Sequence, residues 1–372
     1  MTGPLKKLLS FVAYWLNLWP LVFRMCHVLE RKPILAAFTF HRITPEEPDE
    51  RYLQGYERGV TLAMFERQID RIARFYTIVD LLTFADIATG KKRPTGKLPL
   101  ALLTLDDADS DHLLAFAALE RRGYPGVAFV PTAFIDTDRR FYHLRLTNIC
   151  NCLSSDSWRK VLAGDVPAEV KAALQGLTPQ TLEERRRVRA RLIPPFQKMQ
   201  PAARDQLLDR WEGLINHVYN LGIACMSWRE IIEWSSRGIA MESHTVNHNC
   251  LAMLDDNEVS SELADSKTML EHRTAQAVTA ISYPEGSFDA RTLRAGEETG
   301  YVLGFTAESG LVSYPLKGQD RFLIPRVGAR DGNDREICYS IGSVALKRLL
   351  MLIGKRCRNL FSWSYHGSGR EG

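Results

Sequence analysis

Hydrophobic residues in the first 140 positions of this chain fall into two kinds of segment, which alternate. The first kind is a short, almost continuous apolar run, found at residues 33–43, 98–107 and 126–135. The second kind has apolar residues at helical spacing, found at residues 64–75, within 76–90 and at 111–123. Continuous runs are typical of strands buried on both faces, and the spaced segments predict amphipathic helices. The alternation therefore predicts a parallel sheet with helices packed on its faces.

Local signals mark where these helices begin and end. Thr61 precedes the helix at 64–75 and is its expected N-cap, because a threonine side chain can accept a hydrogen bond from a backbone N–H of the first turn. Gly90 and Gly123 are expected to close the next two helices, since glycine readily adopts the left-handed conformation that ends a helix.

The alternation stops between about Asn148 and Asn220. This stretch holds charged segments such as LEERRRVRARL and RDQLLDRWEGLINHV, with Pro194-Pro195 between them. The sequence therefore predicts a helical insertion rather than a continuation of the sheet. The alternation then returns, with helices expected at 227–238, 256–272 and 290–299 and strands at 239–245, 279–287 and 302–308.

Both ends of the chain carry apolar segments with basic residues. Residues 5–25 are rich in aromatic side chains and begin with two lysines, but they are short for a membrane-spanning helix and lack a small-residue cleavage site. They are expected either to lie on a membrane surface or to cover the bottom of the folded domain. Residues 344–363 have the pattern of a basic amphipathic helix, which can rest on anionic lipid or pack on its own protein. Peripheral membrane contact through these two segments is thus one of two expectations.

Charge and cysteine content narrow the class of protein. The formal net charge of +4 over 372 residues gives no reason to expect nucleic-acid binding. The seven cysteines are odd in number and form no Cys-x-x-Cys pair, so a disulfide framework is not expected. We therefore expect a reducing compartment, with the protein cytoplasmic or peripheral at the membrane rather than secreted.

Polar residues directly follow several of the predicted strands. They are His41, the pair Asp106-Asp107, His244 and Pro284-Glu285. In a (β/α) barrel, the carboxyl ends of the strands form the face that carries the active site. Adjacent aspartates are unusual at such a place, because neighbouring strand residues point to opposite faces and close carboxylates repel each other. A strand-to-helix turn with one aspartate as N-cap is the alternative interpretation of the pair.

The segment MESHTVNHNCL contains His244 and His248, four residues apart. On a helical turn this spacing places both side chains on one side, where they can share a metal ion. Asp107 could supply a carboxylate as the third ligand, and this donor set suits a catalytic divalent ion such as Zn²⁺. The alternative is a pair of surface or helix-cap histidines, but the additional Asp106-Asp107 pair favours the metal site.

Five segments of the chain together form a more specific pattern. In chain order they are FTFHRI, TLDDA (104–108), SHTVNH (243–248), SYPEGSFD (282–289) and IPRVGA (324–329). This series resembles the motifs of the polysaccharide deacetylase family, also called the NodB-homology or carbohydrate esterase family 4 group. The resemblance covers about residues 33–140 and 225–330 and leaves the insertion and both ends outside.

The resemblance implies a distorted (β/α) barrel of the NodB-homology type with a helical insertion. It also implies metal-dependent removal of acetyl groups from the N-acetylated sugars of a polysaccharide or a glycolipid-like precursor. By position in the motifs, Asp107, His244 and His248 would hold the divalent metal, with Zn²⁺ as the first expectation. Asp106 would be the general base that takes a proton from the attacking water, and the backbone N–H of Glu285 would stabilise the oxyanion.

The resemblance also divides the chain. The expected parts are an N-terminal apolar or interfacial helix (1–32), the first part of the deacetylase barrel (33–147), the helical insertion (148–224), the second part of the barrel (225–335) and a C-terminal basic amphipathic helix and tail (336–372).

The chain departs from the family pattern at several motif positions. Ala108 stands where glycine is usual, and Glu285 where an aromatic residue is usual. Ser282 occupies the place of an arginine that tunes the base in other branches of the family. Arg326 from the last motif is expected to fill that role, and Arg42 is a rival for it.

The general acid of the family has no obvious counterpart. Many members keep it in an L-x-L-H segment near the C-terminus, which this chain lacks. His41 is the expected replacement and would protonate the leaving amine, although a hydrogen-bonded structural role for His41 stays open. The other histidines, among them His112 and His143, lie outside any motif and are expected to be structural or on the surface.

Three functions remain open at this stage. Deacetylation of an N-acetylated glycan is the leading interpretation, with that glycan as the expected partner and with no nucleic acid. An O-acetyl esterase acting on a polysaccharide would use the same motifs, because amide and ester cleavage share an oxyanion intermediate. A glycan-binding pseudoenzyme would fit the unassigned general acid and Glu285, but the intact Asp106, Asp107, His244 and His248 argue against it.

Overall fold

A computed structural model of the protein describes residues 34–46, 59–96, 98–177, 179, 181–215 and 224–328. The segments 5–25 and 344–363, with the expectations attached to them, lie outside these ranges. Among the residues that are described, no helix is long and apolar enough to cross a membrane.

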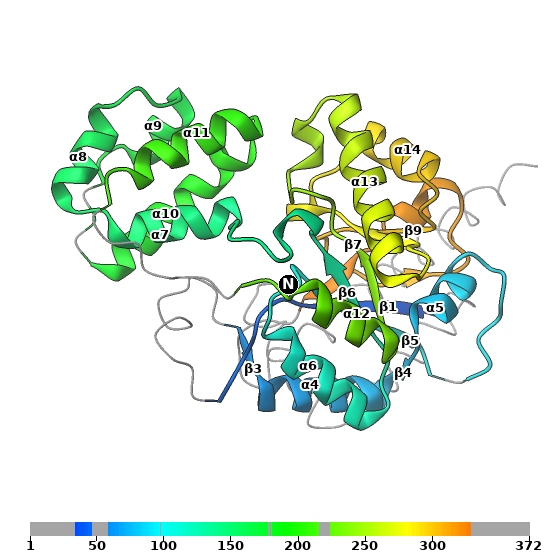
Figure 1. The fold of residues 1–372 in the computed structure, drawn as a ribbon. Coiled ribbons are helices and arrows are strands. Elements are labelled where there is room, and N and C mark those ends of the chain that lie inside the picture. Colours follow the sequence, from blue (N-terminus) through cyan, green and yellow to red (C-terminus); the bar gives the residue numbers. More distant parts are fainter. Residues whose placement is uncertain are drawn as a thin grey trace, which may run out of the picture.

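Seven parallel strands curve into a nearly closed barrel (Figure 1). In chain order they are β1 (Ile34–Phe40), β5 (Leu100–Asp106), β6 (Gly126–Val130), β7 (Ile239–Ser243), β8 (Ala280–Ser282), β9 (Leu303–Phe305) and β11 (Arg326–Gly328). The order around the barrel is β1, β5, β6, β7, β8 and β9, and β11 pairs with β1 on its other side. A parallel bridge between Phe305 and Ile324 links β9 to the segment that leads into β11. The predicted distorted (β/α) barrel is confirmed.

Four short strands accompany the barrel. They are β4 (Thr77–Ile78), parallel to β5; β10 (Val312–Ser313), antiparallel to β1; and β2 (Ile43–Thr44) with β3 (Val60–Thr61), which pair with each other.

Helices cover the barrel where the sequence predicts them. They are α4 (Leu62–Phe75), α5 (Leu81–Ala88), α6 (His112–Arg122), α12 (Trp228–Ser236), α13 (Asp256–Thr274) and α14 (Ala290–Glu298). Single turns of 3₁₀ helix lie at Thr132–Phe134, Leu251–Met253, Pro284–Gly286 and Gly318–Phe322. The Thr61 side chain accepts a hydrogen bond from the backbone N–H of Met64, and Gly123 ends α6 with φ 66°, so both helix signals are confirmed.

Alternate residues of the strands belong to two different apolar clusters. On β1, Ala36 and Phe38 belong to the larger cluster, to which α4 and α6 also contribute. Leu35 and Ala37 belong to a second cluster that contains Phe129 and residues of α5. Because the strands contribute apolar side chains on both faces, their sequences read as continuous apolar runs.

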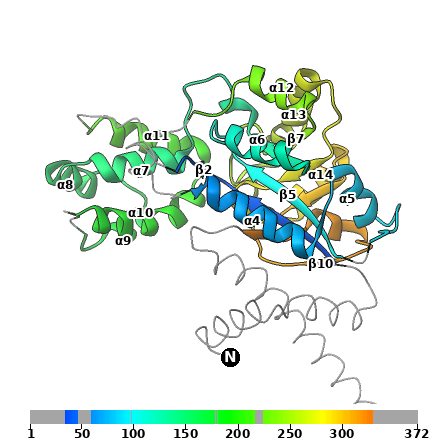
Figure 2. The same cartoon turned by 90° about the horizontal axis from the view of Figure 1, so that it is seen from below.

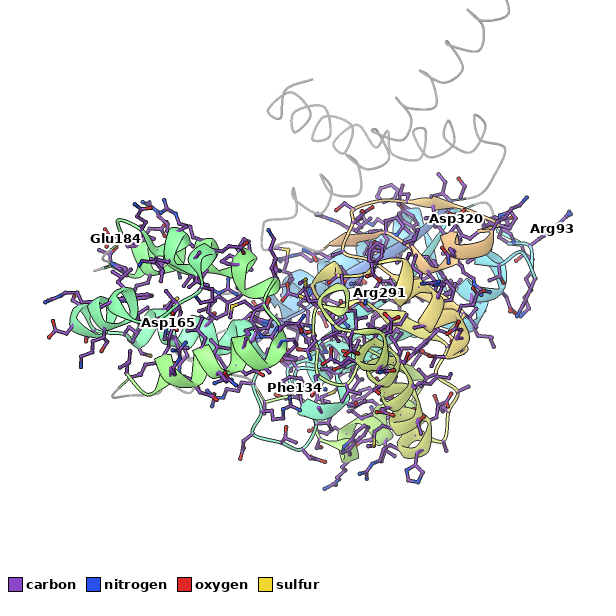
Figure 3. The ribbon with its side chains drawn as sticks, turned by 90° about the horizontal axis from the view of Figure 1, so that it is seen from above. Arg93, Phe134, Asp165, Glu184, Arg291 and Asp320 are labelled. Atoms are coloured by element: carbon purple, nitrogen blue, oxygen red, sulfur yellow. The ribbon has the colours of Figure 1, made fainter. Side chains whose placement is uncertain are left out.

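The helical insertion forms a bundle beside the barrel (Figures 1 and 2). Its helices are α7 (Tyr142–Cys152), α8 (Ser155–Ala163), α9 (Ala168–Leu174), α10 (Leu182–Gln197) and α11 (Pro201–Glu212). The bundle has its own apolar core, which includes Trp158, Phe196 and Trp211. Phe134, on the segment that leads from β6 towards α7, lies between the barrel and the bundle (Figure 3). The domain boundaries given above stay predictions, and the described helices of the bundle begin at Tyr142.

Candidate active site

The parallel strands bring the predicted site residues to one rim of the barrel. Asp106 is the last residue of β5, His244 directly follows β7, and Glu285 lies shortly after β8. His41 directly follows β1. Because the strands run in the same direction, all four residues reach the carboxyl-end rim, where barrels of this kind carry their chemistry.

Backbone geometry explains how two adjacent aspartates reach one site. Asp106 is still in the strand, opposite Phe129 of β6. Asp107 and Ala108 have φ angles of 83° and 53°, a left-handed backbone that costs a non-glycine residue about 1–2 kcal/mol. The turn at Asp107 breaks the alternation of the strand. The alternative interpretation of the pair as an N-cap is wrong, because α6 begins after Asp111.

Asp107, His244 and His248 form a compact cluster. The Oδ1 atom of Asp107 lies 3.5 Å from Nε2 of His244 and 3.3 Å from Nε2 of His248. Burial raises the pKa of a carboxyl group, but the two histidines outweigh that effect and hold the pKa of Asp107 well below its usual range. The three side chains can therefore offer an anionic oxygen and two imidazole nitrogens to one point.

The geometry of this cluster fits a divalent metal. Ligands about 2.1 Å from a tetrahedral ion lie about 3.4 Å from one another, close to the separations between Asp107 and the two histidines. The Nδ1 atom of His244 lies 2.7 Å from the carbonyl oxygen of Ser282. An N–H donated to that carbonyl leaves the lone pair on Nε2, which is how metal-binding histidines are commonly oriented. The donor set suits Zn²⁺.

The loop that carries the two histidines is held by a buried glutamate of α13. One carboxylate oxygen of Glu262 accepts hydrogen bonds from the backbone N–H groups of Val246 and Asn247, each at 2.8 Å. The other oxygen accepts from the side-chain amides of Asn247 at 2.8 Å and Asn249 at 3.4 Å. A single carboxylate thus fixes the backbone of the loop between His244 and His248.

The prediction that His244 and His248 share a helical turn is wrong. The segment after β7 is an irregular loop, not a helical turn. His244 and His248 face the same point because Thr245 and His248 have φ angles of 65° and 53°, and because the N–H of His248 is bonded to the Thr245 hydroxyl oxygen at 3.1 Å.

Arg326 forms a bidentate ion pair with Asp106. Two guanidinium nitrogens lie 2.7 Å from the two carboxylate oxygens, and both side chains are almost completely buried. The hydroxyl of Ser282 donates to the same carboxylate at 3.2 Å. Burial alone would raise the pKa of Asp106, but the Arg326 and His244 charges outweigh it and lower this pKa to about 2. Asp106 is therefore ionised at neutral pH.

Arg42, the other arginine considered as a partner for Asp106, pairs with different aspartates. Nε of Arg42 is 3.2 Å from Asp111 and 3.8 Å from Asp109. Of the two arginines, only Arg326 is paired with Asp106 among the described residues.

Glu285 connects the rim to the bundle. Its backbone has φ 55°, and its side chain accepts hydrogen bonds from the hydroxyl of Tyr142 on α7 at 3.1 Å and from the amide of Gln197 on α10 at 2.9 Å. The glutamate that replaces the usual aromatic residue is thus bound by two helices of the insertion.

Three other histidines lie close to the Asp106-Asp107 pair, to one another or to the candidate metal cluster. His41 is exposed, and its charge contributes to lowering the pKa of both Asp106 and Asp107, so it lies near the site. His112 is fully buried, with Nε2 2.6 Å from the backbone oxygen of His41. His143, expected to be structural or on the surface, lies beside the site, with its ring centroid 6.0 Å from that of His248.

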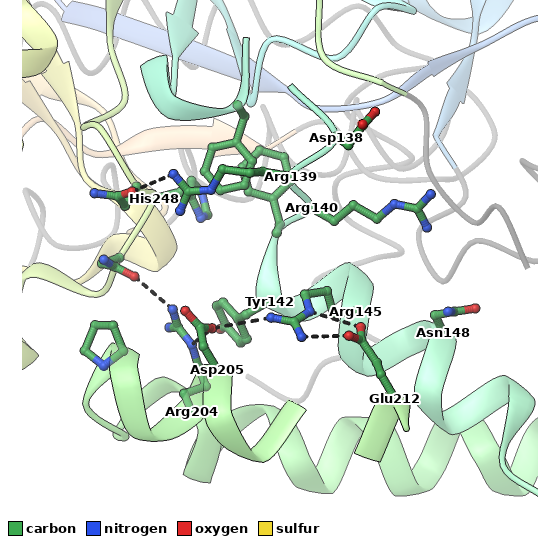
Figure 4. Close-up of a pocket in the computed structure, with 15 residues that line it drawn as sticks. Asp138, Arg139, Arg140, Tyr142, Arg145, Asn148, Arg204, Asp205, Glu212 and His248 are labelled. Atoms are coloured by element: carbon green, nitrogen blue, oxygen red, sulfur yellow. Dashed lines mark hydrogen bonds and ion pairs between the residues drawn. The ribbon is translucent and has the colours of Figure 1, made fainter. Parts of the chain in front are cut away.

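A cleft of about 590 Å³ lies between the rim and the bundle (Figure 4). His248 and Asn249 line it from the barrel, and Tyr142 and Arg204 line it from the bundle. The Arg204 guanidinium lies over the Tyr142 ring, 4.2 Å from its centroid, and donates to the Asn249 side chain at 2.8 Å. The cleft gives a ligand of several hundred Å³ access to the candidate metal ligand His248.

The bonds to Glu262 generate a testable prediction. Replacing Glu262 by alanine removes the acceptor for two backbone N–H groups, so the loop with His244 and His248 loses its fixed geometry. We expect the zinc affinity, measured by competition with a chelator, to fall about 10–100-fold. The matched variant Glu258→Ala, on the exposed part of the same helix, should keep the wild-type affinity. Unchanged affinity in Glu262→Ala would show that the loop needs no such support.

Comparison with known proteins finds similarity to polysaccharide deacetylases. A family model described as polysaccharide deacetylase matches residues 206–304, which include His244, His248 and Glu285. YxkH of Bacillus subtilis (strain 168), which is named as a polysaccharide deacetylase, is 39% identical over 100 residues. That match covers 27% of this chain and 35% of YxkH, so the chain matches about a third of the length of this relative.

Solved structures share the fold over most of the chain. The deacetylase PplD of Streptococcus pyogenes, in complex with acetate, has a TM-score of 0.53 at 16% identity, covering 82% of this chain and 96% of PplD. IcaB from Ammonifex degensii has a TM-score of 0.51 at 15% identity, covering 84% of this chain and 97% of IcaB. At these identities the likeness establishes the barrel fold. The matched segment is thus similar to polysaccharide deacetylases in sequence, and most of the chain shares their barrel fold.

Proposed function

We propose that the protein is a metal-dependent hydrolase that removes acetyl groups from the N-acetylated sugars of a polysaccharide or a glycolipid-like precursor. The observation that carries this proposal is the pairing of two features on one rim. One is the Asp107, His244 and His248 cluster with metal-ligand spacing. The other is the neighbouring Asp106, which is buried and ionised.

Each feature has a part in amide hydrolysis. A divalent ion held by Asp107, His244 and His248 would supply Lewis-acid chemistry, which polarises a carbonyl and makes water a stronger nucleophile. Asp106 would accept the proton of the attacking water. Arg326 keeps this base ionised and fixes its orientation through two hydrogen bonds.

The oxyanion needs a hydrogen-bond donor close to the scissile carbon. The backbone N–H of Glu285 would serve as one, as the resemblance implies. The left-handed backbone at Glu285 reverses the chain at the rim, and the fixed side chain limits its movement. An ordered donor costs less reorganisation during the reaction than a mobile one.

The test of this function is acetate release from N-acetylglucosamine oligomers by the zinc-loaded protein. Asp106→Asn should lower the rate at least about 100-fold because the base is lost, while one zinc ion per chain stays bound. Asp107→Asn should lose both zinc and activity. Equal loss of zinc in the two variants would contradict the separate roles of the two aspartates.

Acetate release by the wild-type protein distinguishes the deacetylase from the esterase and from the glycan-binding pseudoenzyme. Release from O-acetylated polysaccharide but from no N-acetylated sugar would replace the proposal by an esterase. Zinc binding without release from either substrate would favour a glycan-binding pseudoenzyme.

A second prediction concerns pH. Against the upward effect of burial, Arg326, His244 and His41 together hold the pKa of Asp106 at about 2, and Arg326 has the largest share. Without the guanidinium, the upward effect of burial is opposed less strongly, so the pKa of Asp106 rises and the base becomes protonated at a higher pH. In Arg326→Met we therefore expect the acidic limb of the kcat/KM profile to move to higher pH by more than about one unit.

The matched control for this profile is Arg42→Met, which removes the rival arginine that contacts Asp111. It should leave the acidic limb where it is in the wild type. A shift in Arg42→Met without one in Arg326→Met would contradict the assignment.

A further inference from the structure

The helical bundle places a histidine against the rim of the barrel. His143 is the second residue of α7, and its ring stacks on Phe141 at a centroid distance of 5.3 Å with 5° between the planes. The same ring lies 6.0 Å from that of His248. The side chain is 12% exposed, so it is largely shielded from bulk solvent.

A carboxylate of the rim faces one edge of this ring. Nδ1 of His143 lies 3.7 Å from Oε1 of Glu285, which is within ion-pair distance. Glu285 cannot swing away freely, because Tyr142 and Gln197 hold its two oxygens. A carboxylate beside one imidazole nitrogen orients the ring and favours proton donation from the opposite nitrogen, here Nε2.

We propose that His143 is the general acid of the reaction and that Glu285 is its positioning residue. The inference rests on the proposed deacetylase function. Asp106 takes one proton from water as the water oxygen bonds to the acetyl carbon, giving the tetrahedral oxyanion. The C–N bond then breaks, and the nitrogen receives a proton from Nε2 of His143. The products are the free sugar amine and acetate, and Asp106 and His143 exchange their protons with solvent.

This assignment accounts for two departures from the family pattern at once. The chain lacks the L-x-L-H histidine, and it has glutamate where an aromatic residue is usual. In the structure the unusual glutamate faces His143 of the bundle, and this histidine can replace the one that the L-x-L-H segment would have supplied. The donor also lies beside Glu285, whose N–H is the proposed oxyanion donor.

His41 is less suited to the role. It is exposed at the end of β1, and among the described residues no carboxylate lies within ion-pair distance of its ring. His143 has such a partner, and its position is fixed by stacking on Phe141.

The experiment compares substrates that differ in their need for an acid. Amide cleavage expels a strongly basic amine and requires protonation, whereas 4-nitrophenyl acetate releases a stable phenolate without it. In His143→Gln we expect kcat/KM for N-acetylglucosamine oligomers to fall about 100-fold, with a change below about threefold for 4-nitrophenyl acetate. His143→Phe keeps an aromatic ring on Phe141 and should show the same split if the glutamine variant folds poorly. Zinc content and melting temperature verify that each variant is intact.

Two further variants test whether the effect is specific to His143 and its partner. Glu285→Gln should show the same split to a smaller degree, and His272→Gln, at an exposed position of α13, should leave both activities unchanged. Equal losses on both substrates in His143→Gln and His143→Phe would overturn the assignment, as would a split found in His41→Gln alone. A wild-type protein that cleaves neither substrate would overturn the proposed function itself and this assignment with it.

Discussion

Two adjacent carboxylates can stay ionised in a buried site only if each has its own positive partner. Asp106 is paired with Arg326, which arrives from the last strand of the barrel, at 2.7 Å from both oxygens. Asp107 faces the imidazoles of His244 and His248, which can hold a cation between them and the carboxylate. Removing one partner from a buried ion pair commonly costs about 3–5 kcal/mol. The separation of charges therefore ties β5, β7 and β11 together, and it gives the two aspartates different chemical environments.

Directing Asp106 and Asp107 to separate partners also requires a strained backbone. Seven non-glycine residues in the described part of the chain have positive φ, and five of them lie on the site segments, namely Asp107, Ala108, Thr245, His248 and Glu285. Such conformations persist where the surroundings fix them. Glu262 does so for the histidine loop, and the bundle does so for Glu285. Ala108 adopts a left-handed conformation that glycine, usual at this position in the family, would adopt with less strain.

Much of the fold could be predicted from the sequence, because helix caps and apolar runs are local signals. The cap at Thr61 and the end at Gly123 are examples, and both are present. The gathering of His41, Asp106, His244 and Glu285 at one rim followed from the parallel sheet alone. The reason that His244 and His248 converge could not be predicted, since it depends on two left-handed residues in a loop.

Contacts between segments far apart in the sequence were harder to predict than the helices and strands. The sequence left Arg326 and Arg42 as rivals, because the choice depends on how far each side chain reaches along the barrel wall. His143 carried no signal, since it lies in a helix outside every motif and meets Glu285 only through the packing of the bundle. The glutamate at position 285 was the one clue, as an unusual charge at a motif position calls for a partner.

The central claim is that Asp107, His244 and His248 hold a metal ion. Anomalous diffraction at the zinc absorption edge, from crystals of the zinc-loaded protein, tests it most directly. The account predicts one strong peak at about 2.0–2.2 Å from a carboxylate oxygen of Asp107 and from Nε2 of both histidines. A peak confined to the neighbouring Asp109, Asp111 and His112 group, or no peak at the rim, would contradict it.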